Sequence, residues 1–165
     1  MSNLRHWIWL STRSPAPGMY AARILEHFGT PERAYYAGPA EYEAIPGLPG
    51  SVRQALEDKD LAPAETILAQ CSRLGIWVLT LQDAGYPQRL RQLDSAPCVL
   101  YGRGNLPQLD NLPVVAIVGA RKASPYGVMA ARKFAMDLAR QGLVVVSGSA
   151  YGVDAAALQG ALRGG

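Results

Sequence analysis

Residues 114–127 constrain the fold of this chain more than any other segment, because they join an apolar run to a glycine and then to a helix start. The run comprises Val114, Val115, Ala116, Ile117 and Val118. Such an unbroken apolar run is typical of a strand that is buried on both faces. Gly119 is expected to let the chain turn sharply after the strand through backbone angles that other residues avoid. Ser124 and Pro125 then suit the N-cap and the first position of a helix that runs to about residue 141.

A basic pair lies in the loop between this strand and this helix. Arg121 and Lys122 fall between the turn and the helix start, where the first amides of a helix are unpaired and carry a partial positive charge. Two cations at such a place favour a partner that bears phosphate groups. The alternative is a solvated basic loop on an ordinary α/β sheet, and this segment alone leaves both interpretations open.

A second strand and helix follow about twenty residues later. Residues 143–146 are apolar and mostly β-branched, and they lead through Ser147 and Gly148 into an alanine-rich helical stretch that extends to residue 162. Parallel strands of an open α/β sheet place such loops side by side at their carboxyl edge, where the ligands of these folds bind. The two units therefore predict an α/β domain with a parallel sheet.

Three segments of the chain carry a family resemblance. They are VAIVGARKASPYG at 115–127, VVVSGSAYGVDAAALQGAL at 144–162 and, upstream, YPQRL at 86–90 with APCVLYGRG at 96–104. In this order they resemble the DNA-processing protein A family, also called DprA or Smf. The resemblance implies a Rossmann-like fold and a cytoplasmic protein that binds single-stranded DNA, protects it during natural transformation and helps to load a RecA-type recombinase. It also implies that relatives form homodimers.

The same resemblance assigns DNA contacts to residues of both loops. Arg121 matches the arginine that contacts a DNA phosphate in the family, and Gly119 lets the backbone come close to that phosphate. Ser147 and Gly148 match the second motif, where a hydroxyl and an amide are expected to donate to a neighbouring phosphate. Lys122 is expected to act as an auxiliary cation.

Two positions depart from the family pattern. Tyr151 stands where the family usually has an arginine. This exchange removes a cation but leaves a ring that either stacks on a DNA base or packs within the protein, and we include Tyr151 among the expected DNA-binding residues. Leu158 stands where the family usually has a histidine, and its place on the apolar side of the helix, with Leu162, predicts a core residue.

The amino-terminal part differs in charge from the rest. Residues 1–70 carry a net charge of −2, whereas residues 71–165 carry +5. Prolines and glycines divide the first part into short predicted helices, such as 19–28, and a connecting helix is predicted at 62–74. The turn IPGLPG at residues 45–50 resembles a helix–hairpin–helix element. We therefore expect a small all-α module of the helix–hairpin–helix or SAM type at residues 1–70, whose negative charge argues against strong DNA binding.

The Rossmann-like domain is expected at residues 71–165, with residues 76–81 as the first strand of its sheet. The family pattern continues beyond the position of Gly165, so we expect a sheet that is incomplete at its carboxyl end and a chain without the family's dimerisation surface. The sequence has no apolar stretch long enough to span a bilayer. It also shows no signal-peptide pattern.

Residues for catalysis are few in the same part. Residues 71–165 contain no histidine and no glutamate, which leaves little for general acid–base chemistry. Asp154 is expected to lie at a helix start and not to act as a catalyst. Neither a GxGxxG fingerprint nor a PGGxGT loop is present, and Cys71 and Cys98 alone do not make a metal site. We expect no enzyme activity, no cofactor and no metal. Two alternatives stay open: a nucleotide-binding, Rossmann-like enzyme of the phosphoribohydrolase type, and an inactive truncated interaction module.

Overall fold

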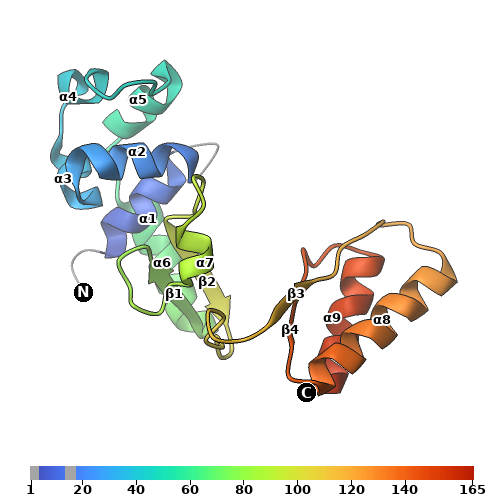
Figure 1. Cartoon of the computed structure of the whole chain (residues 1–165). Coiled ribbons are helices and arrows are strands. Elements are labelled where there is room, and N and C mark those ends of the chain that lie inside the picture. The colour runs from blue at the N-terminus through green and yellow to red at the C-terminus, as the bar shows by residue number, and fades with distance from the viewer. Residues whose placement is uncertain (1–3, 14–17) are drawn as a thin grey trace. The chain divides into compact units, whose positions relative to one another are not determined.

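The computed structural model describes residues 4–13 and 18–165, and the chain forms two compact units, Met1–Leu106 and Pro107–Gly165 (Figure 1). Each unit combines helices with one two-stranded sheet. The predicted junction of the sequence modules at residues 70–71 lies inside helix α6 (Ala62–Leu74) of the first unit. That junction therefore stays a prediction about sequence modules and does not coincide with the boundary between these units.

Helices make up most of the first unit. Its elements in chain order are α1 (Leu4–Thr12), α2 (Met19–Phe28), α3 (Pro31–Tyr36), α4 (Pro39–Glu43), α5 (Gly50–Glu57), α6 (Ala62–Leu74), β1 (Ile76–Thr80), α7 (Gln88–Arg91) and β2 (Val99–Arg103). The bounds of α2 and α6 confirm the sequence prediction. Both helices end at a glycine, and Gly75 after α6 is left-handed with φ +63°, a conformation that glycine adopts without steric cost.

Helix α1 is an element that the sequence patterns miss. All five residues from His6 to Leu10 are buried, and Ile8 and Trp9 have no exposed surface. A helix that is buried all round lacks the alternation of apolar and polar faces by which amphipathic helices are recognised. Trp7, Ile8, Trp9 and Leu10 of α1 all belong to the first unit's hydrophobic core.

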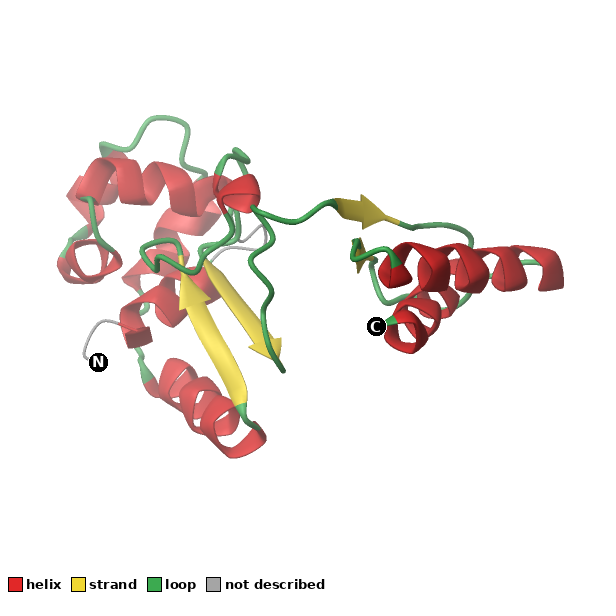
Figure 2. Cartoon of the chain, turned by 60° about the horizontal axis from the view of Figure 1, so that its bottom comes forward, coloured by secondary structure: helices red, strands yellow, loops and turns green. Residues whose placement is uncertain are grey.

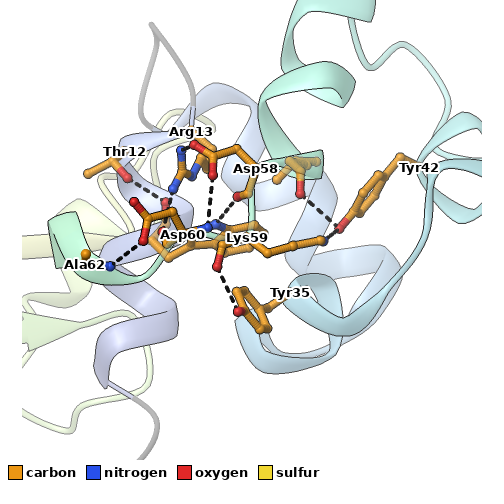
Figure 3. Close-up of polar contacts among 10 residues, drawn as sticks. Thr12, Arg13, Tyr35, Tyr42, Asp58, Lys59, Asp60 and Ala62 are labelled. Atoms are coloured by element: carbon orange, nitrogen blue, oxygen red, sulfur yellow. Dashed lines mark hydrogen bonds and ion pairs between the residues drawn. The ribbon is translucent and has the colours of Figure 1, made fainter. Parts of the chain in front are cut away.

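The Lys59 side chain ties several helices of this unit together (Figure 3). Its ammonium donates to the Ala37 carbonyl at 3.1 Å and to the Tyr42 hydroxyl. It also lies 5.3, 5.5 and 4.8 Å from the ring centroids of Trp9, Tyr35 and Tyr42, within the range of cation–π attraction. Burial lowers the pKa of Lys59 and raises the pKa of Tyr42 to about 12. The ammonium therefore links α1, α3 and α4 at one point.

Strands β1 and β2 form an antiparallel pair, which corrects the prediction that residues 76–81 open a parallel sheet (Figure 2). Ile76 pairs with Arg103, and Thr80 pairs with Val99. The indole of Trp77 covers Gly102, where any Cβ would collide with it, and its Nε1 donates to the Gly104 carbonyl at 2.8 Å. This contact between distant residues fixes the register of β1 against β2, and no local sequence pattern predicts it.

The second unit contains the two predicted strand–loop–helix segments. Its elements are β3 (Val114–Ala116), α8 (Pro125–Arg140), β4 (Val144–Val146) and α9 (Val153–Gly164). The strands are parallel, with Val114 opposite Val144, as predicted. The start of α8 is also confirmed, because the Ser124 hydroxyl accepts a hydrogen bond from the Gly127 amide at 3.1 Å and Pro125 occupies the first turn.

The predicted burial of the second unit is wrong in part. Val118 is 69% exposed and Val146 is 37% exposed, because β3 and β4 pair only with each other in this fully described unit. Helices α8 and α9 lie side by side (Figures 1 and 2), and Gly160 fits directly against the main chain of Arg132. Leu158 is half-buried, but Leu162, predicted to share its face, is 84% exposed.

Candidate nucleic-acid interface

The loops that follow β3 and β4 touch each other through their backbones. The Val153 amide donates to the Ala120 carbonyl at 3.2 Å. Gly152 has φ +86°, and a Cβ at this position would collide with the carbonyls of Ala120 and Arg121. Only glycine therefore allows the second loop to come this close to the first. The structure thus brings the two predicted phosphate-binding loops together at the carboxyl edge of the parallel strands, as expected.

The carboxylate of Asp154 links the first residues of both loops. The residue is 6% exposed and lies in the first turn of α9. Its Oδ1 accepts a hydrogen bond from the Gly119 amide at 3.1 Å. Its Oδ2 lies 3.0 Å from the point that a Cβ on Gly148 would occupy. Asp154 thereby holds the ends of β3 and β4 in a fixed relation.

Sequence reasoning does not identify Asp154 or Gly152 as site residues. The expectation that Asp154 lies at a helix start is confirmed, but its partner Gly119 is 35 residues away in the chain. The sequence does offer one indication for Gly152. A glycine stands directly before the start of a helix, at a position where a residue with a capping side chain is more usual.

The structure gives Gly119 and Ser147 roles that differ from simple phosphate donors. Gly119 does not adopt a left-handed backbone, which corrects the expected reason for this glycine. A Cβ there would lie 2.9 Å from the side chain of Val153, so close packing requires the glycine. The Ser147 hydroxyl donates to the Ile117 carbonyl at 2.7 Å. In this structure the Gly119 amide and the Ser147 hydroxyl bond within the protein and hold the loops together, and of these two groups the Ser147 hydroxyl is the one predicted to donate to a DNA phosphate.

The remaining predicted residues are accessible. Arg121, Lys122 and Gly148 are exposed, and Tyr151 is 86% exposed. The ring of Tyr151 therefore does not pack within this unit. Among the described residues, neither Arg121 nor Lys122 lies within 4.0 Å of a carboxylate oxygen.

The charges around the loops are not balanced. Residues 107–165 contain six basic and three acidic side chains. Of these acids, Asp110 lies in the turn before β3, and Asp137 lies in the second half of α8 and contacts Lys133 at 2.8 Å and Arg140 at 4.0 Å. Asp154 is buried behind the loops. The exposed part of the loops is therefore cationic and lies beside the N-terminus of α8, an arrangement that attracts anions.

Two further observations concern other kinds of site. No group of three or more histidine, cysteine, aspartate or glutamate side chains suited to a metal ion occurs among residues 4–13 and 18–165. In the same ranges, no helix is long and apolar enough to cross a membrane.

Comparison with known proteins gives a consistent result. A family model described as DNA recombination-mediator protein A matches residues 77–165. Protein Smf of Synechocystis sp. is 29% identical over 98% of this chain and 42% of its own length. The DNA processing protein DprA of Streptococcus pneumoniae is 40% identical over 52% of this chain and 30% of its own length. The chain thus spans less than half the length of these curated relatives.

A solved structure resembles both parts of the fold. The X-ray structure of DNA processing protein A from Streptococcus pneumoniae matches with a TM-score of 0.69 and 25% identity, over 97% of this chain and 54% of that one. The match supports a Rossmann-like α/β fold for the parallel strands and their helices. The family model covers more than half of the chain and includes both loops described above. The chain therefore belongs to the DNA recombination-mediator protein A family.

Proposed function

We propose that this chain binds single-stranded DNA through a phosphate cradle formed by the loops 119–124 and 147–152. One observation carries the proposal: Asp154 and Gly152 fix the two loops against each other, and Arg121 and Lys122 are exposed beside them with no carboxylate partner among residues 4–13 and 18–165. Cations on a rigid support are suited to a polyanion. The names of the relatives, which refer to DNA processing, agree with this class of ligand.

Within this cradle, Arg121 is the main phosphate ligand. Its guanidinium offers several donors in one plane and pairs with two phosphate oxygens at once, whereas Lys122 contributes a single mobile charge. The exposed backbone of Gly148 allows a second phosphate to approach the other loop. Such contacts position the strand and carry no sequence information, so we infer binding to strands of any sequence.

Family membership supports a proposal for the broader role. We infer that the chain acts on incoming single-stranded DNA in natural transformation, protects that DNA and assists the loading of a RecA-type recombinase, without catalysis of its own. A nucleotide-hydrolysing enzyme is the competing function. Residues 107–165 offer it no histidine and no glutamate, and the carboxylate nearest the cradle is already bonded to the Gly119 amide.

The test is fluorescence anisotropy of the 165-residue chain with labelled oligo-dT at several salt concentrations. Arg121→Ala is compared with Arg140→Ala. Arg140 is a matched control because it lies in the last turn of α8, about 22 Å along the helix axis from the start of the helix at Pro125. We expect salt-dependent binding that is weakened by Arg121→Ala, with a salt slope smaller by about one, and little change in Arg140→Ala. No binding by the folded wild type, or an equal loss in both variants, contradicts the proposed site. Nucleotide turnover would support the enzyme.

A further inference from the structure

We propose that Tyr126 and Tyr151 stack on DNA bases beside the cradle, so that this chain grips single-stranded DNA by its bases as well as by its phosphates. The inference rests on the proposed DNA binding and extends it to two aromatic side chains, of which Tyr126 has no assigned role. The rings are 73% and 86% exposed. Both rings therefore offer a large, accessible aromatic face to a partner beside the cradle.

Both rings are placed at the same edge of the parallel strands. Tyr126 lies in the first turn of α8, two residues after Ser124, whose hydroxyl caps that turn through the Gly127 amide. Tyr151 directly precedes Gly152, whose backbone lies against the Arg121 carbonyl. One ring thus belongs to each loop-and-helix junction. The backbone of Arg121 lies against Gly152 at one junction, and Arg121 is three residues before Ser124 at the other.

The chemistry of this pair suits a single strand. An aromatic side chain stacks on the face of any base, and this contact tolerates all sequences. In a duplex the base faces are covered by neighbouring bases, so a stacking site also favours single-stranded over double-stranded DNA. The pair therefore supplies a preference that phosphate contacts alone cannot supply, since both kinds of DNA carry phosphates.

A general apolar docking surface is the main competitor, because Met129, Phe134 and Leu162 are also exposed on this unit. Phe134 distinguishes the two explanations. It is 67% exposed on the same helix as Tyr126, about 12 Å further along the helix axis. A base-stacking site at the loops does not use Phe134, whereas a partner that covers the whole apolar surface does.

The experiment compares two probes that carry the same number of phosphates: a labelled oligo-dT and a labelled strand made entirely of abasic residues. Binding is measured by anisotropy for the full chain and for Tyr126→Ala, Tyr151→Ala, Tyr126→Phe and Phe134→Ala. We expect the wild type to bind oligo-dT about tenfold or more tightly than the abasic strand. Each tyrosine-to-alanine change reduces that ratio and leaves abasic binding unchanged. Tyr126→Phe and Phe134→Ala keep the wild-type ratio.

The outcomes separate this inference from the function on which it rests. Equal, salt-dependent binding of both probes by the wild type overturns base stacking and leaves the phosphate cradle standing. No binding of either probe overturns both. A loss in Tyr126→Ala or Tyr151→Ala that is equal for the two probes shows a damaged cradle instead of a lost stacking contact, and it overturns stacking by that residue. A loss in Phe134→Ala equal to that in Tyr126→Ala overturns the assignment to the loops.

Discussion

The Gly119 amide donates a hydrogen bond to Asp154 Oδ1 across 35 residues of sequence, at a distance of 3.1 Å. This bond joins the end of β3 to the start of α9, so the two loops between them share one anchor. Because the Gly119 amide donates to this carboxylate, it is not available to donate to a bound anion. The anion-binding capacity of the site is therefore left to Arg121, Lys122 and the exposed parts of both loops, while Gly119 has a structural role.

Asp154→Ala is expected to loosen this anchor. The change removes the hydrogen bond between the buried carboxylate and the part-buried Gly119 amide, and hydrogen bonds to charged groups contribute about 1.5–3 kcal/mol. All three tryptophans, Trp7, Trp9 and Trp77, lie in the first unit. In urea unfolding, we therefore expect the transition seen by circular dichroism to broaden or shift, with little change in tryptophan fluorescence.

Two variants sharpen this measurement. Asp154→Asn keeps an acceptor oxygen for the Gly119 amide and should lose less stability than Asp154→Ala. Asp137→Ala removes a surface ion pair with Lys133 and should cost less than about 1 kcal/mol. Equal losses for Asp154→Ala and Asp137→Ala would show that the Asp154 bond does not anchor the loops.

Gly152→Ala is expected to separate the two loops. The new methyl group meets the carbonyls of Ala120 and Arg121, and the left-handed φ of +86° adds backbone strain. Gly142→Ala is the matched control, since Gly142 has φ +80° in the same unit but no heavy atom within 4 Å of the point that the new methyl group would occupy. The control should lose about 1–2 kcal/mol from strain alone, and Gly152→Ala should lose more and also bind oligo-dT more weakly. Equal stability and equal DNA affinity in the two variants would contradict the close approach.

Local signals explain what could be predicted of the second unit. The N-cap at Ser124 and the start at Pro125 depend on residues within one turn of the helix, so residue types reveal them. The parallel pairing follows from two strand–loop–helix segments in tandem. The bond between Gly119 and Asp154 depends on where two distant loops meet, and no spacing rule in the sequence encodes it.

The first unit shows the same limit more strongly. The sequence predicts β1 beside the parallel strands, but its partner β2 is selected by the fit of Trp77 over Gly102. Helix α1 escapes prediction because its apolar residues surround the helix and leave no periodic pattern. In both cases tertiary packing decides the structure. The sequence shows which residues are present, but it does not show which of them come into contact.

The contact between Lys59 and Tyr42 is expected to stabilise the first unit. Lys59→Met keeps an unbranched apolar side chain against the rings but removes the donor to the Ala37 carbonyl and to the Tyr42 hydroxyl. We expect a loss of about 1–2 kcal/mol, from the hydrogen bonds and the cation–π contacts. Tryptophan fluorescence in urea measures it. Because Tyr42→Phe removes the shared hydroxyl, the double variant should lose less than the sum of the two single losses. Additive losses would show that the two side chains do not interact.

His6 is expected to make the first unit sensitive to mild acid. Its ring is buried against Tyr35, with centroids 4.9 Å apart, and neither ring nitrogen has a hydrogen-bond partner among the described residues. Burial and the nearby charge of Arg5 lower the pKa of His6 below its usual value of 6.5. The unfolded chain therefore takes up this proton at a higher pH than the folded chain, so the free energy of unfolding falls as the pH drops below about 6.5.

Replacement of His6 tests this titration directly. His6→Phe keeps an aromatic ring beside Tyr35 and removes the ionisable group, so its tryptophan-detected stability should fall less between about pH 7.5 and pH 5.5 than that of the wild type. His27→Phe is the matched control, because His27 is exposed on α2 of the same unit. The change from the wild-type loss of stability over this interval should be larger in His6→Phe than in His27→Phe. If His6→Phe loses as much stability as the wild type over this interval, the acid sensitivity comes from other groups and the buried imidazole does not control it.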